Sequence, residues 1–177
     1  MEQKAYVGSR KFKIPQTIIF GLATVALLGS SCKTEAGNPA KQYLQAMEKT
    51  QVAEKAARSA YSVIQQYLNL GPDTTEAPPI THTKQQLVSA QEAYVKALEA
   101  IAPPNPELKN VHGLLLAAER HRLNGFYELA GALRADDSVG AYRNKTSPAE
   151  LANAEAQRRI EVYSKTLKEI TRKWNQN

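Results

Sequence analysis

The chain has 177 residues, with 23 basic and 17 acidic side chains and a formal net charge of +6. This length suits one globular domain with its own core. A single cysteine, Cys32, excludes an intramolecular disulfide and with it the class of small disulfide-stapled scaffolds.

Residues 1–31 have the order of a secretory signal. Four basic side chains lie within the first 13 positions, an apolar run follows at 18–28, and Gly29, Ser30 and Ser31 precede the cysteine. The apolar run is shorter than the roughly 20 residues that a spanning helix needs. The order of charge, apolar run and small residues therefore predicts export and cleavage.

Cys32 closes the segment Leu28-Gly29-Ser30-Ser31-Cys32, which resembles the lipobox of bacterial lipoproteins. In that family the cysteine thiol is acylated, with chains such as palmitate, and becomes the first residue of the mature protein. The segment departs from the pattern in one respect, because the aliphatic residue expected three positions before the cysteine lies one position earlier, as Leu28. The resemblance implies lipidation at Cys32 and an exported, membrane-anchored protein. Two alternatives stay open, namely an ordinary signal peptide that leaves a free cysteine and an uncleaved anchor.

The mature chain divides into a tether and a domain. Residues 32–40 are small and polar after the cysteine, which predicts a flexible link between lipid and fold. Residues 41–177 form the predicted helical domain. Because residues 1–31 contain four basic groups and one acidic group, their removal lowers the formal charge from +6 to +3.

The first half of the domain predicts two helices. Side chains recur at alternating four- and three-residue steps over residues 40–69, as in a coiled-coil-like helix: Tyr43, Met47, Thr50, Glu54, Ala57, Tyr61, Ile64 and Leu68. Residues 70–82 contain Gly71 and three prolines, which predict a loop. The run Thr83-Lys84-Gln85-Gln86 matches a capping box and predicts a second helix from Thr83 to about Ile101, with Gln91 inside it.

The second half predicts two more helices. A proline-rich turn at 102–106 leads into a third helix at 107–133, whose stripe is Leu108, His112, Leu115, Glu119, Arg122, Phe126, Leu129 and Leu133, widened by Val111, Leu114 and Ala118. Three glycines weaken this helix by roughly 1 kcal/mol each relative to alanine. After an irregular stretch around 136–140, Ser147-Pro148-Ala149-Glu150 predicts the start of a fourth helix. Its stripe is Ala156, Ile160, Tyr163, Leu167, Ile170 and Trp174.

Four amphipathic helices predict an all-α fold, an antiparallel up-down four-helix bundle. The sequence contains no Cys-x-x-Cys, no haem-attachment motif, no His-Glu-x-x-His and no glycine-rich phosphate loop. We therefore expect a non-enzymatic protein without a cofactor.

Polar side chains interrupt two of the predicted stripes at similar depth. Glu54 lies on the first helix, and Glu119 and Arg122 lie on the third. In an up-down bundle these helices run parallel, so the three groups share one level, where Gln91 joins them. One interpretation is a polar layer that fixes register. The alternatives are an anion pocket at Arg122, a metal held by Glu54, Glu119 and His112, or charges that face water.

The other candidate groups carry weaker signals. His112 lies on an apolar face and is expected to be a packed, hydrogen-bonded core residue, whereas His82 lies in a loop and His121 points away from the stripe. The fourth helix carries a basic stripe, which is either a solvated face or a surface that presses on anionic lipid headgroups: Arg158, Lys165, Lys168, Arg172 and Lys173.

The turn at 102–108 followed by residues 111–115 resembles a segment of uncharacterised exported bacterial lipoproteins, in which a Pro-Pro turn leads into a helix with a histidine followed by leucines. That group carries no assigned activity. The sequence thus favours a lipid-anchored cell-envelope protein, periplasmic or on the outer surface of the cell membrane, with the outer membrane as an alternative. We expect it to bind an envelope protein or stabilise an assembly, and not to bind nucleic acid. The alternative is a ligand- or metal-binding bundle that uses Glu54, Glu119 and Arg122.

Overall fold

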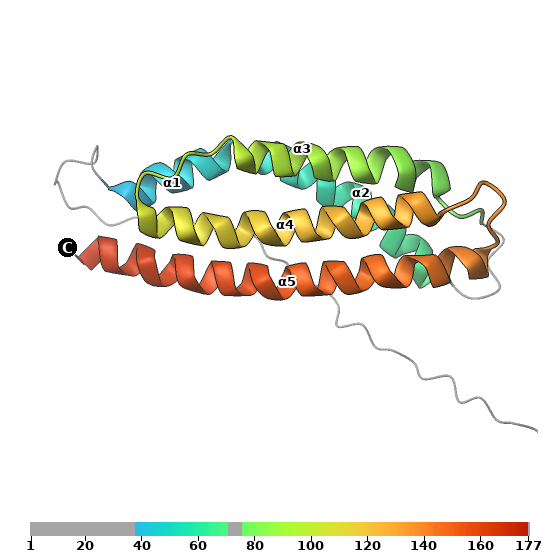
Figure 1. The fold of residues 1–177 in the computed structure, drawn as a ribbon. Helices are drawn as coiled ribbons and strands as arrows, with labels where there is room; N and C mark the ends of the chain where they lie inside the picture. Colours follow the sequence, from blue (N-terminus) through green and yellow to red (C-terminus); the bar gives the residue numbers. More distant parts are fainter. Residues whose placement is uncertain (1–37, 71–75, 177) are drawn as a thin grey trace, which may run out of the picture. The chain divides into compact units, whose positions relative to one another are not determined.

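The computed structural model describes residues 38–70 and 76–176, and within them the chain is helical and contains no strand. The elements are α1 (Pro39–Glu48), α2 (Gln51–Asn69), a π-helical turn η2 (His82–Leu87), α3 (Val88–Glu99), α4 (Pro106–Ala132) and α5 (Val139–Gln176) (Figure 1). The predicted signal, Cys32 and residues 33–37 lie outside the described residues. The all-helical fold class is confirmed for the described part of the chain.

The most extensive packing joins α4 and α5, which run side by side (Figure 1). Their close approach depends on Gly125 of α4, because a Cβ there would lie 2.6 Å from Cβ of Ala152 on α5. α2 packs against α3, α3 packs against α4, and α1 meets α5. A glycine lowers the helix propensity of α4 at position 125, but it also allows α4 to approach α5 closely.

Two apolar clusters form the core. One contains Ile64, Leu87, Phe126, Leu129, Leu133 and Tyr142, among others. The other contains Tyr43, Met47, Leu98, Leu108, Leu115, Leu167 and Ile170, among others. Along α4 they are separated by the turn that carries Glu119 and Arg122, so the polar groups lie between two apolar layers.

The prediction of one continuous helix over residues 40–69 is wrong, because the helix breaks at Lys49 and Thr50. The backbone N–H and the hydroxyl of Thr50 both donate to the carbonyl of Met47, at 3.0 and 2.8 Å. Threonine side chains compete in this way with regular helix hydrogen bonds. The stripe continues across the break, since both Met47 and Thr50 are buried.

The predicted capping box at Thr83 is also wrong. Helical residues begin at Ile80, and Thr83 already lies inside η2. Its N–H and hydroxyl both donate to the carbonyl of Pro79, at 2.9 and 2.8 Å. Since that hydroxyl has one hydrogen, its contact of 2.9 Å with Tyr142 makes the tyrosine the donor. A buried hydrogen bond to α5 has replaced the cap.

The predicted start of the fourth helix at Ser147 is wrong as well. α5 begins at Val139, where the Ser138 hydroxyl accepts from the N–H of Ala141 at 3.2 Å, and Pro148 lies inside the helix. Proline there removes one hydrogen bond to Asn144, whose exposed position leaves that carbonyl open to water. Burial of Tyr142 in the core stabilises the extra turns before Pro148.

Two smaller predictions of burial fail. Leu114 is 41% exposed, so it does not widen the apolar face of α4, and Trp174 is 37% exposed at the end of the α5 stripe. None of the described helices combines the length and the apolar character that crossing a membrane would require.

Candidate functional site

A polar cluster lies between the two apolar layers and joins α3 to α4. The Glu119 side chain is almost fully buried, and Nη1 of Arg122 donates to its two carboxylate oxygens at 2.9 and 2.7 Å. Nε2 of Gln91 donates to the same carboxylate at 2.8 Å. Three of the residues placed at one level by the sequence therefore meet, and the buried carboxylate faces one cation and an amide.

Glu54 lies at the edge of this cluster and has a different cationic partner. Its carboxylate pairs with Arg58, one turn along α2, where the arginine side chain is 55% exposed. The pKa of Tyr94 is raised, first by burial and then by the negative charges of Glu119 and Glu54. The charges of both carboxylates thus act on one tyrosine, although the cation beside Glu119 is Arg122 and the cation beside Glu54 is Arg58.

Arg122 retains one donor that no described protein atom satisfies, since its buried Nε has no hydrogen-bond partner among the described residues. Tyr61 lies near this guanidinium, and its pKa is raised to about 12, chiefly by burial and then by Glu150, with Arg122 opposing the shift. Burial also raises the pKa of Glu150. The positive charge of Arg122 is therefore already compensated by Glu119, which weakens its attraction for a further anion.

A hydrogen-bonded chain of three side chains joins α1, α4 and α5 near this cluster. Nε2 of His112 lies 3.0 Å from the carbonyl of Leu98, so it must donate, and burial lowers the histidine pKa and favours the neutral ring. Nδ1 then accepts from the Tyr43 hydroxyl at 3.0 Å, and the Tyr43 oxygen accepts from Tyr163 at 3.3 Å. Both ring nitrogens of His112 thus form hydrogen bonds within the domain. The sequence placed these residues on separate stripes but gave no signal that they converge.

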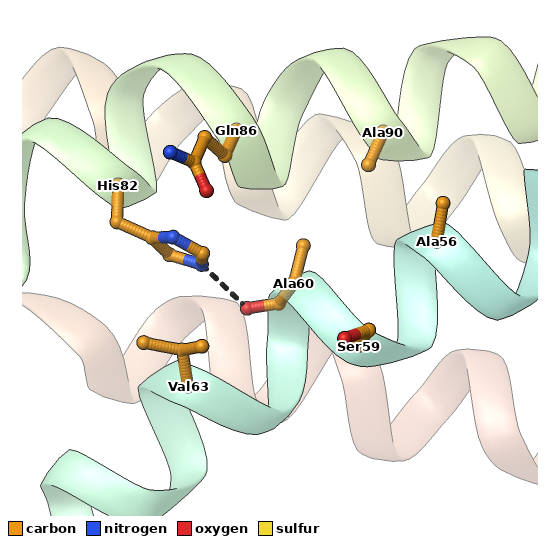
Figure 2. Close-up of a pocket in the computed structure, with 7 residues that line it drawn as sticks. All are labelled: Ala56, Ser59, Ala60, Val63, His82, Gln86 and Ala90. Atoms are coloured by element: carbon orange, nitrogen blue, oxygen red, sulfur yellow. Dashed lines mark hydrogen bonds between the residues drawn. The ribbon is translucent and has the colours of Figure 1, made fainter.

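The described residues contain no group of three or more histidine, cysteine, aspartate or glutamate side chains placed to hold a metal ion. The expectation that His82 lies in a loop is wrong, because it is the first residue of η2. Its Nε2 donates to the carbonyl of Ala60 at 2.8 Å (Figure 2).

An open groove runs between α2 and the η2–α3 segment, with a volume of about 460 Å³. Figure 2 shows small side chains on the α2 wall, Gln86 and Ala90 on the opposite wall, and the His82–Ala60 hydrogen bond at one end. The lining residues are Ala56, Ser59, Ala60, Val63, His82, Gln86 and Ala90. A second hollow of about 410 Å³ lies between the α1–α2 break and the end of α3, lined by Ala46, Lys49, Thr50, Ala97, Ala100, Ile101 and Ala102. Sequence reasoning missed both, because alanines on an outer helix face carry no distinctive pattern.

The basic stripe of α5 divides into two parts. Arg158 and Arg159 both pair with Glu155. The later basic residues are exposed and form no ion pair within residues 38–70 and 76–176: Lys165, Lys168, Arg172 and Lys173.

No protein-family model, no curated protein sequence and no solved structure matches this chain.

Proposed function

We propose that this chain is a lipid-anchored protein of a bacterial cell envelope whose helical domain binds another protein and performs no catalysis. The lipobox-like segment supports anchoring through acylated Cys32, on the periplasmic side or the outer surface of a membrane. The groove between α2 and α3 supports protein binding, and it is the observation that carries this part of the proposal.

The proposed architecture is an antiparallel up-down four-helix bundle in which α1 and α2 together form the first helix. The hydrogen bonds from Tyr43 support it, since they link α1 to both α4 and α5. The order of contacts along α4 also supports it, because Gly125 approaches Ala152 of α5, whereas the earlier residue His112 lies near the later residue Tyr163. That order is the one expected for antiparallel neighbours.

The chemistry of the groove suits a helix of a partner protein. Its walls are mostly alanine and serine, and small side chains let a second backbone approach closely. Val52 and Val63 add apolar area on the same exposed side of α2, where they are 82% and 36% exposed. Exposed apolar surface of this kind is typical of interaction sites.

The polar cluster has a structural role in this proposal. Glu119 receives hydrogen bonds from Arg122 and Gln91, so its charge is compensated inside the domain. Arg122 matches the charge of Glu119 within α4, and the buried hydrogen bond from Gln91 of α3 to Glu119 favours one register of α3 against α4. A small-ligand site at Glu54, Glu119 and Arg122 is the competing function, and the partnerless Nε of Arg122 is the observation that favours it.

The protein-binding proposal is tested with two alanine-to-arginine variants. Ala56→Arg places a long charged side chain in the groove, and Ala117→Arg places one on the exposed face of α4 outside it. The wild-type chain and Ala117→Arg should co-purify one partner in fixed stoichiometry from the envelope, and Ala56→Arg should lose it while keeping its helical circular dichroism. Equal retention by both variants would remove the groove from the proposal.

The anchoring proposal is tested at Cys32. Wild-type chain extracted from membranes should have the mass of the chain from Cys32 plus acyl groups, and an inhibitor of the lipoprotein signal peptidase should block its cleavage. Cys32→Ala should remove both properties. A cleaved Cys32→Ala chain that still partitions with membranes would show that the lipid is not the anchor.

A further inference from the structure

The start of α1 and the last turn of α5 lie at the same end of the helical domain. Nδ2 of Asn38, the N-cap of α1, is 3.5 Å from Oδ1 of Asn175. Tyr43 and Tyr163 join the same two helices one to three turns further in, through their hydroxyl groups. An anchor attached to the chain before Asn38 therefore also keeps the last turns of α5 close to that anchor.

The chain between Cys32 and Asn38 is short. Six residue steps separate the two positions, and a fully extended chain spans at most about 3.5 Å per residue, or about 20 Å in all. In the proposed lipoprotein, the end of the domain that carries Asn38 and Asn175 is thus confined to within about 20 Å of the bilayer surface.

That end of α5 has the side chains that a lipid headgroup region favours. Lys168, Arg172 and Lys173 are exposed and form no ion pair inside the described part of the chain. Trp174 is 37% exposed beside them, although it continues the apolar stripe of the helix. Tryptophan prefers the membrane interface, and lysine and arginine are attracted by anionic headgroups.

We propose that the last three turns of α5 dock the domain end-on upon an anionic phospholipid surface, through Lys168, Arg172, Lys173 and Trp174. The inference rests on the anchoring part of the proposed function, which supplies the proximity. Each basic side chain at an anionic surface contributes about 1 kcal/mol, or about fivefold in the ratio of docked to undocked domain. Three such groups together change that ratio by about 100-fold.

Trp174 is the only tryptophan of the chain, so its fluorescence reports on this surface alone. Full-length protein extracted from membranes is reconstituted into phosphatidylcholine vesicles with and without phosphatidylglycerol. We expect a blue shift of Trp174 emission, and quenching by lipids brominated near the headgroup, only when phosphatidylglycerol is present. High salt should reverse both changes, because it screens the attraction.

A charge-reversal variant identifies the residues responsible. Lys168→Glu, Arg172→Glu and Lys173→Glu together should abolish the response to phosphatidylglycerol. The matched control carries Lys55→Glu, Lys84→Glu and Lys96→Glu, which make the same change of net charge at exposed positions on α2, η2 and α3. The control should respond like the wild type. Identical Trp174 emission in both kinds of vesicle, or equal loss in the control, would overturn the proposal.

The mass of the reconstituted chain separates this inference from the one it rests on. Acyl mass on Cys32 with no Trp174 response would leave the anchor intact and refute headgroup docking. A Trp174 response from a chain without acyl mass, held in the vesicle by its N-terminal apolar segment, would support docking and refute lipidation. If the basic side chains only stabilise the end of α5, the triple variant lowers helicity and vesicle composition has no effect.

Discussion

Replacing Arg122 with methionine removes the cation that faces Glu119, and the structure indicates how much this should cost. The Glu119 side chain is 3% exposed and the Arg122 side chain 14% exposed, so neither charge is compensated mainly by water. Loss of one partner strands the other charge in the interior, which typically costs 3–5 kcal/mol. Gln91 would remain as a donor to the carboxylate but supplies no charge. We expect a loss of about 3–5 kcal/mol, a large share of a typical domain stability of about 5–15 kcal/mol.

Arg58→Met is the matched control, since it removes an arginine paired with a carboxylate on the same helix. The pair of Arg58 and Glu54 has an i,i+4 spacing, and the arginine is 55% exposed. Such pairs contribute about 0.3–0.5 kcal/mol, because water screens them. The two substitutions should therefore differ by at least about 2 kcal/mol.

Urea denaturation of the chain from Lys33, followed by circular dichroism, measures both costs. The double variant Glu119→Leu/Arg122→Met should regain most of the stability that Arg122→Met loses, because no charge is left unpaired. Similar losses for Arg122→Met and Arg58→Met would refute the buried pair. A stable double variant that fails to complement a knockout would favour the ligand site over the structural role.

Three further predictions follow from individual contacts. Gly113→Ala should stabilise the domain by up to about 1 kcal/mol, since a Cβ there meets nothing within 4 Å. Gly125→Ala should destabilise it, because its Cβ would lie 2.6 Å from Cβ of Ala152. The melting temperatures of the two variants should therefore shift in opposite directions. Leu115→Ala should cost roughly 2–5 kcal/mol in urea unfolding, because Leu115 is buried in the core, and a loss below about 1 kcal/mol would contradict that packing. Burial lowers the pKa of His112 below its usual 6.5. As the pH falls below about 6.5, the unfolded chain therefore takes up a proton on this histidine that the folded chain does not. The free energy of unfolding should decline in that range. That decline should be smaller in His112→Gln, and equal slopes for the two proteins in urea titrations at each pH would contradict it.

The apolar stripe of α4 was predictable from the sequence. Leu108, Leu115, Phe126, Leu129 and Leu133 are all buried as the spacing predicts. Both boundaries of α4 lie within one residue of the predicted range 107–133. At its start, the side chain of Asn105 accepts a 2.8 Å hydrogen bond from the N–H of Leu108. Periodicity succeeds here because burial of one face is imposed at every turn of a long helix.

Local capping motifs were poor guides to helix boundaries. Thr83 and Ser147 both lie in sequences that suit a helix start, yet both are inside helices. Burial of Tyr142 and its hydrogen bond to Thr83 stabilise turns that lie before each motif. A cap contributes about 1 kcal/mol, and burial of an aromatic side chain contributes more, so packing overrides the local signal.

The sequence predicted the depth in the helical domain at which the candidate site lies, but not which cation pairs with which carboxylate. Depth along the helices placed Glu54, Glu119, Arg122 and Gln91 together, and the raised pKa of Tyr94 is consistent with the proximity of both carboxylates. Which cation faces which carboxylate depends on side-chain direction. Glu119 meets Arg122 at i,i+3 on its own helix, and Glu54 meets Arg58 at i,i+4. Both spacings bring side chains of one helix together, but helical spacing does not specify which of several nearby cations each carboxylate takes.

The sequence alone determined that this domain is helical and which faces of its helices are apolar, because both follow from the order of residues along one chain. The tertiary structure decided where α1 gives way to α2, why Gly125 is required, how Tyr43, His112 and Tyr163 join, and that Asn38 lies beside Asn175. The break between α1 and α2 involves a local contact of Thr50 with Met47, whereas the other three depend on the distance between segments far apart in the chain. That distance is fixed only when the apolar faces pack, and no local pattern encodes it.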